Sequence, residues 1–335
     1  MTLRAKITGT GMYVPDRVVT NDDLAKLMDT SDEWIRKRTG IEQRRYISEG
    51  QQPSDLAREA SERALAAANL SAGELDCIVL ATLSPEADFP GTPFFLQEQL
   101  GLSDTPCFDL RAQCSGFIYS LSVANSFIRS GMYRRVLVVG CEVHSTGIDL
   151  TDTGRDVSVI FGDGAGAVVL EANEAEDDAA GLVEVRLHAE GQFAKRLWVE
   201  APGSGFTPTR LNHELLDQGR HFPYMEGRFV FKHAVTRMPQ VLLETLNAAS
   251  VKLEDVDVFL FHQANLRINE YVMNQLNIEP SRCLNNIQRY GNCSAASIPM
   301  LLDEAVRGGQ LQPGGIVSMT AFGSGFSWAS AVARW

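Results

Sequence analysis

The sequence predicts an α/β protein made of two similar halves, and three observations support this class. Apolar patterns with helical spacing alternate along the chain with short apolar runs, such as 75–82 and 256–261. These runs lack the polar–apolar alternation of a half-exposed strand, which favours parallel sheets covered by helices on both faces. Short segments of the first part of the chain also recur, in the same order, in the second part.

Composition narrows the possible classes of function. The chain has 335 residues, 44% of them hydrophobic, and a formal charge of −12, which argues against non-specific binding to nucleic acid or anionic membranes. Residues 1–6 lead into no apolar segment typical of a signal peptide, and the longest apolar runs are too short to span a bilayer. We therefore expect a cytoplasmic, enzyme-sized chain with no nucleic-acid or membrane partner.

The elements of the first half can be placed in order. A short strand is expected at 6–9, and Thr20 provides a helix-capping side chain ahead of acidic residues. Ser54 is expected to cap an alanine-rich helix that runs to Asn69. The elements expected next are a strand at 75–82, a loop at 84–92, a helix at 93–100 and a strand at 135–140.

Cys114 occupies a turn between a strand and a helix. The segment 108–117 begins as the end of an apolar strand, and apolar residues then recur at helical spacing from Phe117 to Ile128. Unpaired backbone N–H groups and the positive end of the helix dipole lower the pKa of a thiol at such a place. Cys114 is therefore a candidate nucleophile, and the alternative is an inert core cysteine.

Two further patterns are interpreted without a ligand. The glycine-rich segment 161–166 is followed by a β-type apolar run, whereas a dinucleotide-binding fingerprint requires a helix there. Cys141 and His144 resemble a pair of metal ligands, but they follow a buried-type strand, and no second pair is close in sequence. We therefore expect no metal site and no nucleotide bound through the glycine-rich segment.

The recurring segments divide the chain into halves 1–175 and 176–335, with the acidic, small-residue stretch 171–180 as the link. The run 75–80 corresponds to the run 256–261, and matched segments are offset by 176 to 181 residues. Two such halves would pack as one pseudo-symmetric body in which equivalent turns meet at the centre.

This symmetry predicts which residues surround Cys114. The turn 289–294 should be equivalent to the Cys114 turn in the repeat. The strand end at His262 should be equivalent to the strand end at Thr82. We therefore expect His262 and Asn292 to lie near Cys114. A glycine-rich turn at 321–327, between two strand patterns, would bring backbone N–H groups close to a reacting atom.

A cysteine, a histidine and an asparagine together suggest acyl or thioester chemistry. In a papain-like hydrolase His262 would deprotonate Cys114. Alternatively, His262 and Asn292 both donate hydrogen bonds to the carbonyl oxygen of a second substrate. The sequence around Cys114 matches no cysteine-protease signature.

The segment 30–41 combines an aromatic residue with several bases. A solvated helix anchored by Trp34 explains the pattern without a ligand, and the residues alone favour this interpretation. The alternative is a site for an anionic, aromatic-bearing ligand, on which Trp34 stacks and with which Arg38 pairs.

These motifs together resemble the β-ketoacyl-ACP synthase III branch of the thiolase superfamily. They occur in family order and cover nearly the whole chain. The segments that carry the resemblance are Thr30–Ile35, Arg38–Ile41, Ala112–Gly116, Phe161–Ala167, His262–Arg267, Gly291–Ser297 and Ala321–Gly325. The resemblance implies a five-layered αβαβα thiolase fold, a homodimer and acyltransferase activity in fatty-acid initiation, with acyl-CoA as a substrate and no permanently bound cofactor.

The resemblance also implies a two-step reaction. Cys114 takes an acyl group from acyl-CoA, and His262 and Asn292 then hydrogen-bond the carbonyl of malonyl-ACP while decarboxylation generates an enolate. The resulting carbanion attacks acyl-Cys114, and the backbone N–H groups of Cys114 and Ser324 receive the tetrahedral oxyanion. The products are a 3-oxoacyl thioester and CO2.

Binding roles are carried over in the same way. The resemblance places Trp34 and Arg155 around the adenine of CoA. The residues implied nearby, or at other subsites, are Thr30, Arg38 and Asn265 for CoA, Phe89 and Met225 for the acyl pocket, and Lys232 and Arg267 for docking of acyl carrier protein. His144, His188 and His213 match no catalytic position, and we expect structural roles for them.

The chain departs from the family pattern at several places. Ser324 stands where many relatives have glycine, Asn274-Gln275 replaces a basic pair, and the segment 192–225 is about ten residues longer than expected. Gln113 beside Cys114 is shared with specialised homologues. The alternatives are therefore a specialised homologue that uses malonyl-CoA or an unusual starter in quinolone- or polyketide-type metabolism, and a non-enzymatic homologue that binds acyl-CoA.

Overall fold

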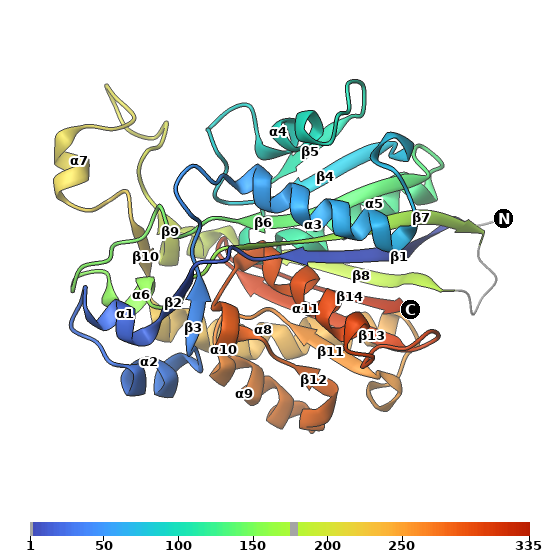
Figure 1. Cartoon of the computed structure of the whole chain (residues 1–335). Helices are drawn as coiled ribbons and strands as arrows, with labels where there is room; N and C mark the ends of the chain where they lie inside the picture. The colour runs from blue at the N-terminus through green and yellow to red at the C-terminus, as the bar shows by residue number, and fades with distance from the viewer. Residues whose placement is uncertain (1–2, 175–179) are drawn as a thin grey trace.

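Two five-stranded sheets lie one over the other, with helices between them and on their outer faces (Figure 1). The computed structural model describes residues 3–174 and 180–335. Within these ranges, no helix has the length and apolar character needed to cross a membrane.

Each sheet takes its strands from one side of residue 175. The first contains β1 (Leu3–Tyr13), β7 (Gly164–Glu174), β6 (Arg135–Glu142), β4 (Cys77–Ala81) and β5 (Cys107–Leu110), in this spatial order. The second contains β8 (Gly181–Ala189), β14 (Ser327–Arg334), β13 (Ile316–Gly323), β11 (Val258–Phe261) and β12 (Cys283–Leu284), in the equivalent order.

The strand directions match between the two sheets, but the prediction of parallel sheets is only partly right. β4 pairs in parallel with β5 and β6, and β11 pairs in parallel with β12 and β13. β7 and β14, however, run antiparallel to both of their neighbours. An unbroken apolar run indicates that a strand is buried on both faces, as these strands are. It does not indicate whether the strand runs parallel or antiparallel to its neighbours.

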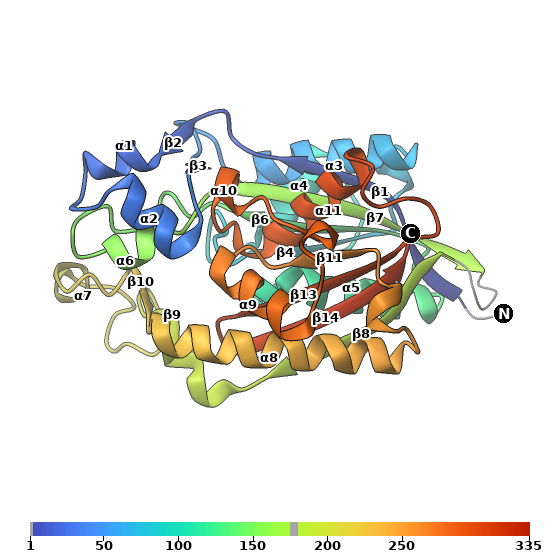
Figure 2. The same ribbon diagram turned by 90° about the horizontal axis from the view of Figure 1, so that it is seen from below.

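Helices complete five layers (Figure 2). The outer face of the first sheet carries α3 (Pro53–Ala68) and α4 (Thr92–Gln99), the space between the sheets holds α5 (Gly116–Arg129) and α11 (Ser297–Arg307), and the outer face of the second sheet carries α8 (Gly227–Ala248) and α9 (Leu266–Leu276). The central core packs Phe117 and Leu121 of α5 and Leu301 of α11 between strands of both sheets. Both central helices point their first turns toward the same end of the molecule, where the remaining short elements gather.

Those short elements lie together at one end of the sheets (Figure 1). They are α1 (Asn21–Ala25), α2 (Asp32–Thr39), α6 (Arg155–Ser158), α7 (His213–Asp217), α10 (Ile287–Tyr290), the β2 (Val18–Thr20)–β3 (Gln43–Arg45) pair and the β9 (Leu197–Val199)–β10 (Pro223–Met225) pair. As predicted, Thr20 caps α1 by accepting the backbone N–H of Asp23 at 3.2 Å.

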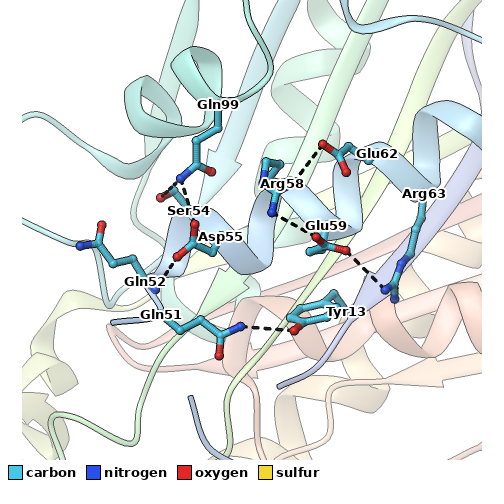
Figure 3. Close-up of polar contacts among 10 residues, drawn as sticks. All are labelled: Tyr13, Gln51, Gln52, Ser54, Asp55, Arg58, Glu59, Glu62, Arg63 and Gln99. Atoms are coloured by element: carbon cyan, nitrogen blue, oxygen red, sulfur yellow. Dashed lines mark hydrogen bonds and ion pairs between the residues drawn. The ribbon is translucent and has the colours of Figure 1, made fainter. Parts of the chain in front are cut away.

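Several boundaries differ from the predicted ones. β1 is much longer than the expected 6–9. Ser54 does not cap α3; the N-cap is Gln52, and the Asp55 carboxylate accepts the backbone N–H of Gln52 at 2.8 Å (Figure 3). Pro53 fits the first helical position because its backbone is already in the required conformation, so the N-cap lies two residues earlier than predicted. The predicted link 171–180 overlaps β7, and its residues 175–179 lie outside the described part of the chain.

The central helices begin in the same way. A 3₁₀ turn, Gln113–Ser115, precedes α5, and another, Ser294–Ala296, precedes α11. Gln113 and Ser294, the first residues of these turns, have φ angles of +45° and +40°. Such angles are uncommon for residues other than glycine and are concentrated at functional sites. The two turns face each other across the pseudo-symmetric centre, which is the place where the site was predicted.

Candidate active site

Cys114 lies in the 3₁₀ turn before α5, with 9% of its surface exposed. The backbone N–H groups of Cys114 and Ser324 approach its sulfur and lower the pKa of the thiol, but burial dominates and raises that pKa to about 12. The thiol of Cys114 therefore does not have the lowered pKa predicted for this turn, although its backbone N–H groups act in the predicted direction. A closed environment disfavours the charged form more than the first turn favours it.

The second half supplies the polar groups of the site. His262 directly follows β11, and its backbone N–H donates to the carbonyl of Thr320 at 2.9 Å. Asn292 precedes the second 3₁₀ turn, and its Oδ1 accepts the backbone N–H of Ser294 at 2.8 Å. This bond fixes the amide of Asn292 with its nitrogen as the remaining donor. His262 and Asn292 are buried, and both line the same cavity as Cys114.

His262 is neutral in this environment. Burial and the nearby His144 lower its pKa to about 3. Within the described part of the chain, Nδ1 of His262 has no hydrogen-bond partner. A neutral imidazole donates one hydrogen bond without carrying charge, so His262 can polarise a carbonyl oxygen.

The turn between β13 and β14 closes the site. It holds Ser324, whose Oγ donates to the carbonyl of Leu197, and the carbonyl of Ser327 accepts from Ser115 Oγ at 3.1 Å. These bonds tie the glycine-rich turn to β9 on one side and to the Cys114 turn on the other. The predicted approach of the Ser324 N–H to the reacting atom follows from this arrangement.

A cavity of about 1950 Å³ connects these residues with the protein surface. It brings together nine of the predicted site residues, which are Cys114, His262, Asn292, Ser324, Trp34, Arg38, Asn265, Met225 and Arg267. Four predicted residues lie outside its wall, namely Thr30, Phe89, Arg155 and Lys232.

The outer wall of the cavity is aromatic and basic. The guanidinium of Arg38 lies 4.3 Å from the ring centroid of Trp34, and that of Arg155 lies 5.0 Å from it. Arg155 also donates to the carbonyl of Asp29 at 2.8 Å. In this structure Arg155 therefore covers the Trp34 ring itself and does not line an open slot for a base.

Other predicted binding residues have structural partners. Asn265 caps α9, and its amide nitrogen donates to the carbonyl of Arg38 at 3.0 Å, which fastens α9 to α2. Arg267 is exposed and lies over the ring of Phe231, the residue before the exposed Lys232. Two bases on the neighbouring helices α8 and α9 therefore flank the same surface.

Phe89 is 82% exposed, in the loop at 84–92. The adjacent Asp88 forms an ion pair with Arg210, which belongs to the long segment 192–225. This segment contributes Leu197, Trp198 and Val199 to the cavity wall. The two loops predicted to shape an acyl pocket thus contact one another.

Sequence reasoning missed three residues close to Cys114. Ser294 Oγ lies 3.7 Å from the sulfur and 3.0 Å from Nε2 of His144, a residue expected to be structural. Glu142 is buried beneath the site and accepts the backbone N–H of Ala295 at 3.3 Å; burial raises the pKa of its carboxyl to about 7. His144 was visible in the sequence only as half of an unconvincing metal-ligand pair.

Comparisons with known proteins agree with the family resemblance of the sequence. Family models for 3-oxoacyl-[acyl-carrier-protein] synthase III and for its C-terminal part match residues 108–191 and 246–335. A β-ketoacyl-[acyl-carrier-protein] synthase III of Roseiflexus sp. (strain RS-1) is 45% identical over 99% of this chain and 98% of its own length. The crystal structure of a 3-oxoacyl-[acyl-carrier-protein] synthase III from Aquifex aeolicus VF5 is 43% identical, covers 99% of this chain and 100% of its own, and has a TM-score of 0.89.

A second solved structure comes from another kind of pathway. It is the priming β-ketosynthase of the R1128 polyketide biosynthetic pathway, which is 31% identical, covers 99% of this chain and 97% of its own, and has a TM-score of 0.89.

Fold and site together define a thiolase-fold acyltransferase of the condensing type. The chain belongs to the 3-oxoacyl-[acyl-carrier-protein] synthase III family.

Proposed function

We propose that this protein starts acyl chains by condensing an acyl-CoA with malonyl-ACP, and that Cys114, His262 and Asn292 carry the chemistry. The observation that supports this most directly is their meeting in one buried cavity although they come from opposite halves of the chain. In the first step the sulfur of Cys114 attacks the thioester carbonyl of acyl-CoA, and CoA leaves as a thiol. Acyl-CoA is thus a substrate and not a resident cofactor.

The backbone N–H groups near the sulfur suit this first step. Cys114 and Ser324 both direct N–H groups toward the reacting atom. The oxyanion that forms when a thioester carbonyl is attacked would lie beside them. Donors fixed in place before the reaction stabilise developing charge without reorganisation, and each is worth several kcal/mol in a closed site, about 3 kcal/mol where it has been measured in other enzymes.

His262 and Asn292 suit the second step. Loss of CO2 from a malonyl thioester places negative charge on the thioester oxygen as an enolate forms. Two neutral donors stabilise this charge without protonating the enolate carbon, which must stay nucleophilic to attack acyl-Cys114. The low pKa of His262, about 3, keeps the imidazole neutral and makes it a hydrogen-bond donor here.

The cavity entrance supports the choice of thioester carriers. Lys37, Arg38 and Arg267 are exposed and line the cavity beside Trp34, a combination that fits the phosphates and the base of CoA. We include Arg155 and Thr30 at the CoA site on the condition that Arg155 leaves the Trp34 ring. Lys232 and Arg267 would then meet the acidic carrier protein at the same entrance.

The proposal is tested by product analysis. The purified protein is incubated with acetyl-CoA and longer acyl-CoAs, and then with malonyl-ACP, while acyl-enzyme, CO2 and 3-oxoacyl-ACP are followed by mass spectrometry and radiometric assay. We expect acyl-enzyme to form first and CO2 and 3-oxoacyl-ACP to appear in equal amounts. Free fatty acid without any need for malonate would instead indicate a hydrolase, and binding without turnover would indicate a non-enzymatic homologue.

A second candidate function is favoured by the segment 192–225. This segment contains the β9–β10 pair, which lines the cavity, and α7, and it contacts the loop at 84–92 through Arg210 and Asp88. Such a segment beside an acyl pocket suits an unusual starter unit in specialised metabolism. Comparing turnover with malonyl-CoA and malonyl-ACP, across a ladder of acyl-CoA lengths, separates this function from fatty-acid initiation.

We also propose a homodimer formed along β5. This strand lies at the edge of its sheet, and Phe108 on it is 39% exposed. Phe89 and Phe94 nearby in sequence are 82% and 47% exposed, and Phe89 would reach the partner's acyl pocket. Exposed apolar groups at a sheet edge are normally covered. In such a dimer, each subunit would contain the halves 1–175 and 176–335 as two structural units.

A further inference from the structure

The thiol of Cys114 donates a hydrogen bond to Ser294 Oγ, 3.7 Å away. The same oxygen lies 3.0 Å from Nε2 of His144. All three side chains are buried, with exposed fractions of 9% for Cys114, 1% for Ser294 and 7% for His144. The polar atoms of Cys114, Ser294 and His144 therefore form a buried hydrogen-bonded row that starts at the sulfur and ends at the imidazole.

This row addresses a difficulty in the first step. Burial raises the pKa of Cys114 to about 12, so the free thiol is protonated at neutral pH. The sulfur must lose that proton when it attacks a thioester. His262 is assigned to the second substrate, and its pKa is affected by His144 nearby, so the two imidazoles occupy neighbouring but separate places.

The direction of the hydrogen bonds from Cys114 to Ser294 and on to His144 follows from the number of hydrogens that each group can donate. A serine hydroxyl has one hydrogen and can accept at its oxygen. Since the thiol donates to Ser294 Oγ, the hydroxyl hydrogen is left to point elsewhere, and Nε2 of His144 is within reach. Burial lowers the pKa of His144 to about 3, so the resting imidazole is neutral and has one nitrogen free to accept.

Contacts from both halves keep the three groups aligned. The backbone N–H of His144 donates to Asp163 Oδ1 at 2.7 Å, and the His144 ring packs on Phe161 at a centroid distance of 4.5 Å. Ser294 is fixed by the bond from its N–H to Asn292 and by its backbone at φ +40°. A strained backbone at this point is consistent with a hydroxyl placed for function.

We propose that Ser294 and His144 form a proton relay that activates Cys114 for acyl transfer. Ser294 touches the reacting sulfur, and His144 acts through Ser294. This inference rests on the proposed function, because it needs an acyl thioester as substrate.

The step balances within the site. As the sulfur of Cys114 attacks the thioester carbonyl carbon, its S–H bond breaks, its proton passes to Ser294 Oγ, and the hydroxyl proton of Ser294 passes to Nε2 of His144. The transfers accompany the attack, because a resting imidazole with a pKa of about 3 does not deprotonate a resting thiol with a pKa of about 12. The electron pair left on sulfur forms the new bond to the thioester carbonyl carbon. When the tetrahedral intermediate collapses, the carbon–sulfur bond to CoA breaks, and the CoA sulfur receives a proton back through Ser294 from the imidazolium. The products are acyl-Cys114, CoA thiol and neutral His144.

The experiment measures single-turnover acylation of Cys114 by acyl-CoA in Ser294→Ala, His144→Leu and His144→Gln, with His213→Gln as the control. His213 is exposed on α7. We expect Ser294→Ala and His144→Leu to slow acylation by about 100-fold or more, the range of general acid–base catalysis. His144→Gln retains an oxygen that accepts from Ser294 but takes up no proton, so it should stay slow.

A second readout separates the relay from a structural role. Each variant is acylated by long incubation, and release of CO2 from malonyl thioester is then timed. We expect this rate within about threefold of wild type, since the relay serves only the first step.

Normal acylation in Ser294→Ala or His144→Leu would overturn the relay, and rescue by His144→Gln would reduce His144 to a hydrogen-bond partner and overturn its proton-accepting role. If His144→Leu does not fold, Ser294→Ala, which removes one oxygen, decides the matter. Failure of the wild type to acylate with any acyl-CoA would instead remove the proposed function itself.

Discussion

Gly323 packs directly against Cys114. A β-carbon placed on Gly323 would lie 2.7 Å from the β-carbon of Cys114 and 3.2 Å from its sulfur. Gly323 ends β13, and Cys114 belongs to the turn before α5, so this contact joins the second sheet to the turn that holds the reacting atom. The close approach also brings the next residue, Ser324, near enough for its N–H to face the sulfur.

We therefore expect Gly323→Ala to impair acylation of Cys114 by at least about tenfold and to lower the free energy of unfolding by about 1–3 kcal/mol, since the added methyl group overpacks a closed site. Urea unfolding and single-turnover acylation check both values. Gly73→Ala is the matched control, because a β-carbon there meets no atom within 4 Å. Equal behaviour of the two variants would show that the contact is not restrictive.

Cys114→Ala should abolish the covalent acyl adduct, because no other group in the site is proposed as the acceptor. Intact mass after incubation with acyl-CoA gives the result directly. Cys107→Ala is the control, since Cys107 is a half-buried thiol on β5 that does not line the cavity. An adduct that persists in Cys114→Ala would assign the acceptor elsewhere.

His262→Ala and Asn292→Ala should still acylate but lose decarboxylation of malonyl thioester by about 100-fold or more, which is the usual effect of removing one donor at a developing oxyanion. Release of CO2 from the pre-acylated enzyme measures this step alone. His188→Ala is a suitable control, because His188 is a partly exposed partner of Glu244. Condensation at the wild-type rate in either site variant would contradict the donor pair.

Acid should destabilise the fold through His144 and His262. Burial lowers the pKa of each to about 3, whereas the unfolded chain takes up these protons near pH 6.5. The folded state therefore binds fewer protons than the unfolded state between about pH 3 and 6.5, and stability falls as pH falls through that window. Each histidine contributes up to about 1.4 kcal/mol per pH unit.

Urea unfolding of wild type and His144→Leu at several pH values from 7 to 4.5 measures this effect. The difference between the two proteins reports His144 together with its effect on the pKa of His262. Glu142, whose raised pKa of about 7 acts with the opposite sign, is present in both. We expect wild type to lose stability faster on acidification. Parallel curves would mean that folding does not lower the pKa of His144.

The internal repeat predicted the meeting of His262 and Asn292 with Cys114, because equivalent strand ends and helix starts must converge when two like halves stack. Similarly, chemistry of the side chains around Thr20 predicted a helix start that the structure confirms. These predictions rest on local spacing and on symmetry, both of which are visible in a linear chain.

Other features depend on packing in three dimensions. The high pKa of Cys114 arises from atoms of both halves that enclose the sulfur, which no local pattern reports. The contact of His144 with Ser294 joins residues 150 positions apart that are not equivalent positions of the repeat. The position of Arg155 over Trp34 likewise depends on how α6 packs against α2.

The reacting sulfur takes one neighbouring N–H from Ser324, more than two hundred residues further along the chain. While the protein is being synthesised, a ribosome-bound chain that has not yet reached β13 and β14 has Cys114 without Gly323 against it and without the N–H of Ser324 near its sulfur. We therefore expect such a nascent chain not to take acyl groups from CoA. Ser324, the last contributor to the site, is translated late. Activity should therefore appear only after both halves have been made and joined.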